Sequence, residues 1–153
     1  MKRGGKMKLE SLAFKYNQMI PSKYTCEGED INPSLKISGV PKNAKTLVLI
    51  MDDPDAPMGT WVHWLVWNMS PQTTEILENS VPDQSSEGTT SWGRSGYGGP
   101  CPPSGTHRYF FKLYALDTEL SLPPQTDKVG LEKAMTSHIL DKTELIGLYK
   151  KQR

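Results

Sequence analysis

The chain has 153 residues, with 18 Lys+Arg against 17 Asp+Glu and a formal net charge of +1 at pH 7. A chain of this length fits one domain that buries a core without a metal or disulfide to staple it. The balanced, alternating charges exclude a protein that binds nucleic acid by neutralising many phosphates. No apolar run approaches the roughly 20 residues that cross a bilayer, so we expect no stable membrane insertion.

The first seven residues are basic, but the apolar stretch of a secretion signal does not follow them. We therefore interpret residues 1–7 as a poorly ordered leader and residues 8–153 as a single domain, and we expect a cytoplasmic location. Cys26 and Cys101 lack any CxxC or Cys/His zinc spacing. We expect two buried or loop thiols, and the alternative is a single bridge between loops.

Short apolar runs separated by turn residues predict an all-β or mainly β domain. The expected strands are residues 8–14, 33–38, 46–52, 61–68 and 107–116, with a short last strand at 144–149. Residues 128–140 have the apolar spacing of a helix, and Asp127 precedes them as a candidate N-cap.

Residues 61–68 are apolar on both faces if their side chains alternate regularly. The period of two places Trp61, His63, Leu65 and Trp67 on one face and Val62, Trp64, Val66 and Asn68 on the other. A strand of this kind is covered on both sides. In residues 107–116 the same period places His107 and Tyr109 together and Arg108 opposite.

Residues 70–106 contain almost no periodic apolar pattern, which is unusual for a connection in a compact domain. Half of the residues from 88 to 105 are glycine or proline. Glycine lets the backbone approach a ligand closely and proline stiffens the loop. This composition therefore indicates a functional loop.

Four polar segments are candidates for chemistry. They are residues 52–57 (DDPDAP), His63, residues 99–103 (GPCPP) and residues 105–109 (GTHRY). Each also has a purely structural explanation, as a turn, a core histidine or part of an ordinary strand. We expect Arg108 to form a structural ion pair with an acid of the 52–57 turn.

Two histidines on separate strands, with carboxylates between them, fit three kinds of site. They could bind a small anion, with an aspartate fixing one imidazole tautomer and with loop N–H groups and the Tyr109 hydroxyl as further donors. They could instead hold a divalent metal with a water molecule. Acid–base catalysis is the third choice, and the residues alone leave all three open.

In their order and spacing these segments resemble the phosphatidylethanolamine-binding proteins, also called Raf kinase inhibitor proteins, and specifically the shorter bacterial and archaeal members. The resemblance covers nearly the whole chain. The segments that carry it are 24–33 (YTCEGEDINP), 53–57 (DPDAP), 61–64 (WVHW), 97–103 (YGGPCPP), 105–109 (GTHRY) and 144–147 (ELIG).

The resemblance implies a mainly β fold, a β-sandwich of two antiparallel sheets with one or two short helices. It also implies a small pocket for phosphate-type head groups. Carried over position by position, the binding residues would be Asp53, Asp55, Trp61, His63, Gly99, Pro100, Pro102, His107 and Tyr109. In these roles Asp53 orients a histidine, both imidazoles and Tyr109 donate to the anion, and Trp61 and the prolines form a dry wall. No catalytic residue, metal ligand or cofactor is expected.

We therefore expect a non-enzymatic binding or regulatory protein whose pocket takes phosphate, phosphoethanolamine or a phosphorylated partner. Two alternatives are a serine protease inhibitor that acts through an exposed loop and a hydrolase that uses a metal or the His/Asp set. The resemblance makes a kinase or a serine protease the candidate protein partner. Segments rich in Trp and Tyr favour a homodimer.

Overall fold

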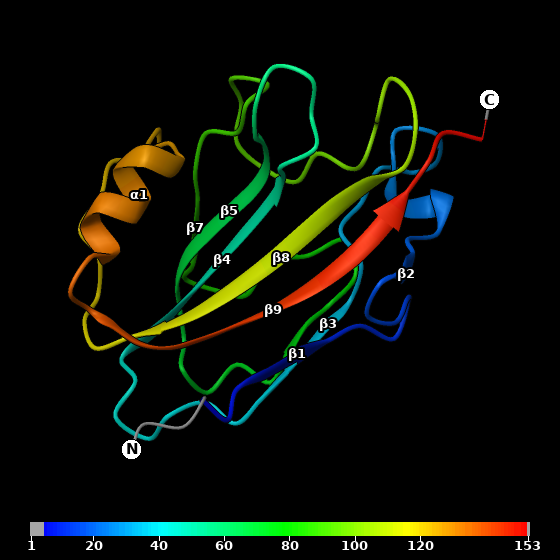
Figure 1. The fold of residues 1–153 in the computed structure, drawn as a ribbon. Coiled ribbons are helices and arrows are strands. Elements are labelled where there is room, and N and C mark those ends of the chain that lie inside the picture. The colour runs from blue at the N-terminus through cyan, green and yellow to red at the C-terminus, as the bar shows by residue number, and fades with distance from the viewer. Residues whose placement is uncertain (1–4, 153) are drawn as a thin grey trace.

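The structure, a computed structural model, describes residues 5–152 and builds them into two sheets flanked by one α-helix (Figure 1). The strands are β1 (Lys8–Glu10), β2 (Gln18–Met19), β3 (Leu35–Ser38), β4 (Thr46–Asp53), β5 (Trp61–Met69), β6 (Glu75–Ile76), β7 (Ser86–Glu87), β8 (His107–Leu116) and β9 (Ile139–Tyr149). The helices are the 3-10 turn η1 (Ser22–Tyr24) and α1 (Lys128–Met135).

The larger sheet has the strand order β2-β9-β8-β4-β5-β7, and the smaller sheet has the order β1-β3-β6. Neighbouring strands are antiparallel throughout the described residues, except that β2 pairs with β9 in parallel over two residues. The prediction of a mainly β fold with two sheets and a short helix is therefore confirmed, with that one parallel pairing as a difference.

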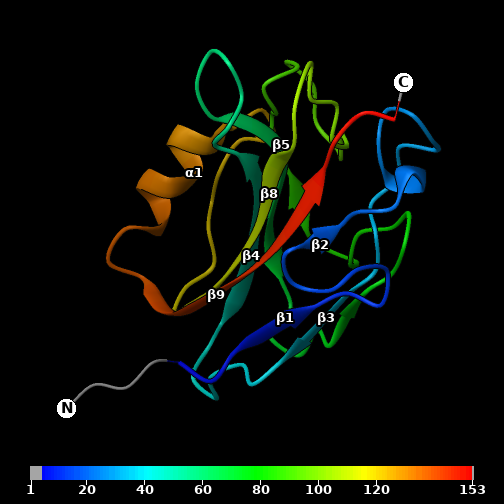
Figure 2. The ribbon, with the colours of Figure 1, turned by 45° about the vertical axis from the view of Figure 1, so that its right-hand side comes forward.

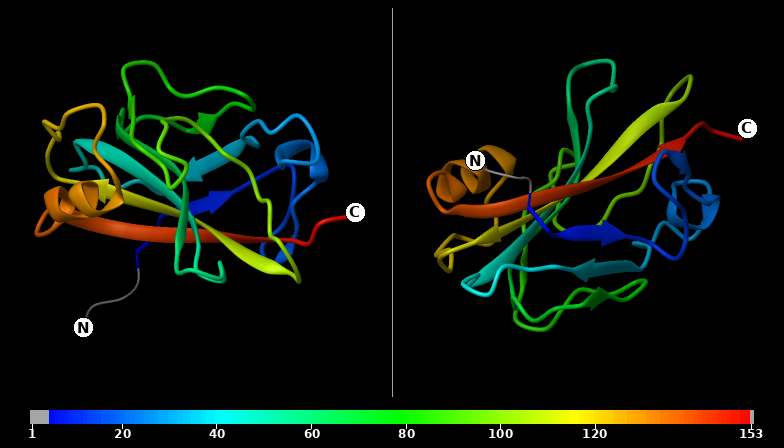
Figure 3. Two further views of the ribbon diagram at one scale, coloured as in Figure 1. Left: turned by 90° about the horizontal axis from the view of Figure 1, so that it is seen from above. Right: turned by 60° about the horizontal axis from the view of Figure 1, so that its bottom comes forward.

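The fold has three layers, with the larger sheet in the middle, the smaller sheet on one face and α1 on the other (Figure 2). Strand β4 shows why both faces are covered. Leu47, Leu49 and Met51 pack toward the smaller sheet, whereas Val48 and Ile50 pack toward α1. The views in Figure 3 place α1 and the C-terminal end of β9 at opposite sides of the molecule.

Helix α1 is fastened at its N-terminal end. The Asp127 side chain accepts a hydrogen bond from Gly130 N at 3.0 Å, as predicted for the N-cap. Lys128 reaches the Asp52 carboxylate, which is buried, at 2.8 Å. The helix is shorter than the predicted 128–140, because Ser137 adopts a left-handed conformation (φ 73°) and β9 begins soon afterwards.

Strand β5 contains a bulge that regular alternation does not predict. Met51 pairs with Trp64 and Asp52 pairs with Val62, so His63 has no partner in β4. Val62 consequently packs with Leu65 on the α1 side of the sheet. The prediction that His63 shares a face with Leu65 is wrong, because the extra residue changes the alternation and turns His63 to the other face, against Tyr109.

Cys26 and Cys101 form a disulfide with their Cα atoms 5.5 Å apart. The expectation of two free thiols is therefore wrong. The two cysteines are 75 positions apart in the sequence, but the fold brings their loops together, and Cys26 N donates to Pro100 O at 3.1 Å. Sequence spacing carries no information about this contact.

The segment predicted as a leader, residues 1–7, lies partly outside the described residues. Its last residue belongs to the folded structure, because Met7 is buried and its N–H donates to Asp141 at 3.2 Å. The long connection from 70 to 106 has only the two-residue strands β6 and β7.

Candidate functional site

Strands β4, β5 and β8 meet at one end of the larger sheet and form a cavity of about 270 Å³. Asp53 is the last residue of β4, where Pro54 ends the strand, and it pairs with Trp61 at the start of β5. His107 begins β8, the strand on the other side of β4. The lining residues are Asp53, Ala56, Pro57, Trp61, His63, Trp92, Cys101, Pro102, Pro103, His107 and Tyr109.

The central polar contact of the cavity joins Asp53 to His107. Both residues are buried, and His107 Nδ1 lies 2.7 Å from Asp53 Oδ2. The other carboxylate oxygen accepts the N–H of Asp55 at 2.7 Å. The carboxylate is thus fixed from both sides and holds the His107 proton on Nδ1, which leaves Nε2 as the remaining polar atom of that ring.

His63 is held in a different way. Its Nδ1 lies 2.7 Å from the carbonyl oxygen of Gly98, which can only accept, so Nδ1 carries a proton. Burial lowers the pKa of His63, although the Gly98 contact and nearby aspartates act against this effect. A neutral ring protonated at Nδ1 has an acceptor at Nε2, which differs from the donor role predicted for His63.

Tyr109 brings a buried hydroxyl close to the Asp53 carboxylate and the Cys101 backbone. Its side chain is fully buried, and its hydroxyl has no hydrogen-bond partner among the described residues. Burial, with the nearby Asp53 carboxylate as a smaller cause, raises the pKa of Tyr109 well above its usual range. The hydroxyl therefore stays protonated at all ordinary pH values.

The aromatic wall of the cavity includes Trp92, which was not among the predicted binding residues. Trp92 meets Trp61 edge to face at 5.5 Å and His63 at 5.1 Å between ring centroids. The Arg94 guanidinium lies over the Trp92 ring, 5.3 Å from the ring centroid. A tryptophan inside a Gly/Pro-rich loop was the available signal, because such a large apolar residue needs a packing partner.

Three of the nine proposed binding residues support the cavity without lining it. Asp55 accepts from Arg108 through Nε and Nη2, each at 2.9 Å, which confirms the predicted ion pair with the 52–57 turn. Gly99 N donates to Asp30 at 2.8 Å. Pro100 O accepts from Cys26. The other six, namely Asp53, Trp61, His63, Pro102, His107 and Tyr109, line the cavity.

Other parts of the surface offer less chemistry. A larger groove of about 730 Å³ follows residues 8–16 and part of β9, but its buried lining residues are all apolar: Leu9, Phe14 and Leu145. Within residues 5–152 no group of three His, Cys, Asp or Glu side chains is arranged to hold a metal ion. The described part of the chain also has no helix long and apolar enough to cross a membrane.

The fold and this cavity define a class of two-sheet β proteins with a buried Asp–His pair beside a Gly/Pro-rich loop. The family model described as phosphatidylethanolamine-binding protein matches residues 10–150. The chain therefore belongs to the phosphatidylethanolamine-binding protein family, and membership supports a binding protein.

Individual relatives agree with this assignment. The UPF0098 protein PH1269 of Pyrococcus horikoshii is 50% identical, and the match covers 97% of this chain and 81% of the relative. The UPF0098 protein of Methanothermobacter thermautotrophicus is also 50% identical, over 95% of this chain and 99% of its own.

Two crystal structures have the same fold. CT736 of Chlamydia trachomatis, described as a homologue of phosphatidylethanolamine-binding proteins, superposes with a TM-score of 0.92 at 44% identity and covers 95% of this chain and 98% of its own. YbcL of E. coli, described as a member of the mammalian family, has a TM-score of 0.90 at 26% identity and covers 97% and 100%.

Proposed function

We propose that the cavity binds a small anion of the phosphate type and that this protein is a non-enzymatic binding or regulatory protein. The observation that carries the proposal is the buried hydrogen bond from His107 Nδ1 to Asp53 at the base of a largely apolar cavity. It orients the ring so that Nε2 is left for a ligand.

The other polar atoms of the cavity indicate which protonation state of the anion it prefers. The Tyr109 hydroxyl is a second donor without a partner among the described residues. His63 Nε2, on a neutral ring, accepts a hydrogen bond, so it favours a ligand oxygen that carries a proton. A phosphate monoester loses its second proton near pH 6. We therefore expect the pocket to prefer the phosphate monoanion, and affinity to fall as pH rises above about 6.

The test is an NMR titration of the imidazole resonances with inorganic phosphate and with phosphoethanolamine. We expect saturable shifts of His63 and His107, whether or not a metal chelator is present. His107→Ala should abolish these responses without unfolding the protein. His138→Ala is the matched control, because His138 pairs with Asp117 at the exposed end of the helix region and should leave binding unchanged. Retained affinity in His107→Ala would refute the proposal.

The same preparations separate the alternative functions. Stoichiometric inhibition of a chymotrypsin-like protease that survives His107→Ala would favour a protease inhibitor acting through an exposed loop. Turnover of a phosphoester that requires the His/Asp set would favour a hydrolase.

A kinase or protease partner, a homodimer and a cytoplasmic location are further parts of this proposal. Most cytosolic proteins keep their thiols reduced. Rapid alkylation of fractionated cells therefore tests the location together with the state of Cys26 and Cys101.

A further inference from the structure

The Cys26–Cys101 disulfide lies at the rim of the proposed binding cavity, which Cys101 helps to line. Both cysteines are exposed. We propose that this disulfide is a site of thiol–disulfide exchange with a dithiol. Opening it releases the wall segment, residues 101–106, of which Cys101, Pro102 and Pro103 line the cavity.

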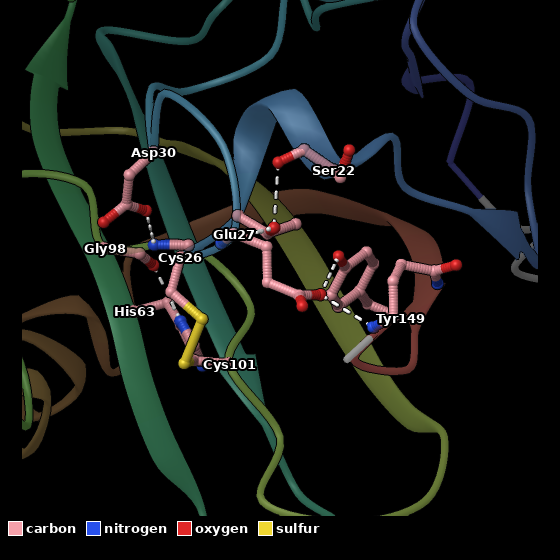
Figure 4. Close-up of a disulfide and its surroundings, with 11 residues drawn as sticks. Ser22, Cys26, Glu27, Asp30, His63, Gly98, Cys101 and Tyr149 are labelled. Atoms are coloured by element: carbon pink, nitrogen blue, oxygen red, sulfur yellow. Dashed lines mark hydrogen bonds between the residues drawn. A yellow bond between two sulfur atoms is a disulfide. The ribbon is translucent and has the colours of Figure 1, made fainter.

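The Cys26 side of the bond is held firmly by its own surroundings (Figure 4). Thr25 Oγ1 donates to Ser22 O at 2.8 Å, and Glu27 accepts from the hydroxyl of Tyr149 on β9. Cys26 N donates to Pro100 O. This loop therefore keeps its place whether or not the disulfide is closed.

The Cys101 side is different. The chain just before it is fixed, because Gly98 exchanges hydrogen bonds with His63 and Gly99 N donates to Asp30. From residue 102 to residue 106, no hydrogen bond is found within the described part of the chain, and pairing resumes only when β8 begins at His107. Beyond Pro100, whose carbonyl accepts from Cys26 N, the disulfide is thus the covalent tie between this wall and the fixed Cys26 loop.

The released segment would move away from the cavity as a unit. Pro100, Pro102 and Pro103 restrict the backbone, so a change at Cys101 is transmitted along the segment. Pro102 is buried and lines the cavity, so its departure admits water beside His107 and Tyr109. Hydrogen bonds to an anion weaken when water enters the site. This effect on affinity rests on the proposed function, whereas the exchange and the release do not.

The dithiol is the reductant in this exchange. One thiolate of the dithiol attacks a sulfur of the Cys26–Cys101 bond, forms a mixed disulfide and expels the other cysteine as a thiolate, which takes up a proton. The second thiol of the reagent, as its thiolate, then attacks the mixed disulfide and releases the remaining cysteine. Two electrons pass to the protein, and the dithiol leaves as its own disulfide.

The first measurement is the rate at which dithiothreitol releases thiols, followed by alkylation and mass spectrometry at increasing urea concentrations below the unfolding transition. Exchange in the folded protein gives a rate that hardly depends on urea. A rate that rises steeply with urea means that the bond opens only through global unfolding, and it would overturn the proposal. This measurement needs no variant.

The second measurement is the mobility of the wall by NMR relaxation of the backbone amides of Cys101, Ser104, Gly105 and Thr106. In the reduced protein we expect their order parameters to fall to about 0.6 or lower, from about 0.85 for rigid backbone. The hydrogen-bonded amides of Gly98 and Gly99 are internal controls and should not change. A Cys26→Ser/Cys101→Ser double variant should behave like the reduced protein and should not respond to dithiothreitol.

Phosphate affinity, read from the His107 resonance, separates this proposal from the proposed function. We expect the reduced protein to bind about tenfold more weakly than the oxidised one, and reoxidation to restore binding. Increased mobility with no phosphate binding in either form would support the exchange site and refute the anion pocket. Unchanged order parameters after reduction would overturn the proposed release of the wall, whatever the exchange rate, and leave the bond without an effect on the cavity.

Discussion

The Tyr109 hydroxyl is a buried polar group that forms no hydrogen bond within the described residues. Such a group costs about 1–3 kcal/mol when it is left without a partner. Tyr109→Phe keeps the ring that meets His63 edge to face at 5.2 Å and removes only the hydroxyl. We therefore expect the variant to be more stable than the parent by about 1 kcal/mol, measured by urea unfolding without ligand.

If the cavity binds phosphate as proposed, the same variant should lose affinity by about tenfold, because the anion loses one donor, and tenfold corresponds to about 1.4 kcal/mol. A gain in stability together with a loss of phosphate affinity is the result expected when a hydroxyl serves ligand binding and does not stabilise the fold. A variant that is destabilised and binds phosphate normally would show instead that the hydroxyl has a structural role.

Asp55 illustrates a residue whose charge supports the site from outside. The Arg108 guanidinium lowers the pKa of Asp55 from 3.8 to about 2, chiefly through its side-chain hydrogen bonds. Because the pKa is lower in the folded protein, the unfolded chain takes up this proton first, and the stabilisation present above about pH 4 is lost as pH falls toward 2. Arg108 is half exposed, so solvent screens the pair and its contribution to stability is small.

Asp55→Asn should therefore reduce the free energy of unfolding at pH 6 by about 0.5–1 kcal/mol, and the difference from the parent should shrink at pH 2.5. Urea unfolding at both pH values measures it. Asp83→Asn, at an exposed position, is the control and should change neither value. A deficit that is equal at pH 6 and pH 2.5 would contradict an electrostatic origin.

At the scale of elements, the N-terminal end of α1 depends on a side-chain cap. Asp127 accepts from Gly130 N, and its replacement by alanine leaves that N–H without its partner. We expect Asp127→Ala to cost about 1 kcal/mol and to speed amide exchange in Lys128–Met135. Asp127→Ser should retain most of the stability because serine also caps. Equal losses in both variants would mean that the cap is not the cause.

The elements that the sequence predicted well are those with a long apolar period. Strand β8 has the predicted bounds, and β4 and β5 extend one residue beyond theirs. The two-residue strands β2, β6 and β7 are too short for any period to emerge. The bulge at His63 was not predictable either, because it arises from pairing with β4 and not from the residues of β5.

The lining of the candidate cavity was predictable to a similar extent. Six of the nine residues assigned from motifs line the cavity, since the ends of β4, β5 and β8 carry them. Trp92 and the disulfide partner of Cys26 come from a loop without periodic pattern, and only the tertiary fold places them. The His63 tautomer depends on the Gly98 carbonyl, which is likewise a tertiary contact.

At the scale of the whole molecule, residues 14–20, the N-terminal segment, are joined to the larger sheet by close packing at Gly147. This residue lies in β9 between β2 and β8, and a Cβ at its position would lie 2.5 Å from Ile20 Cγ1 and 2.7 Å from Phe14 Cε2. Ile20 and Phe14 are both buried in the core between the sheets, so neither can move aside freely.

Gly147→Ala should therefore displace the N-terminal segment from β9 and lower the free energy of unfolding by about 1–3 kcal/mol. Amide exchange should show where the effect begins. Asn17 N and Ile20 N, which donate to carbonyl groups of β9, should exchange faster, and amides in the β4–β8 pairing should lose less protection. Gly130→Ala in α1 is the matched control, because alanine favours a helix and the nearest atom to its Cβ is a side-chain methyl of Thr126. If both variants were equally stable, the contact at Gly147 would not hold the N-terminal segment, and its position would depend on the backbone pairing of β2 with β9 alone.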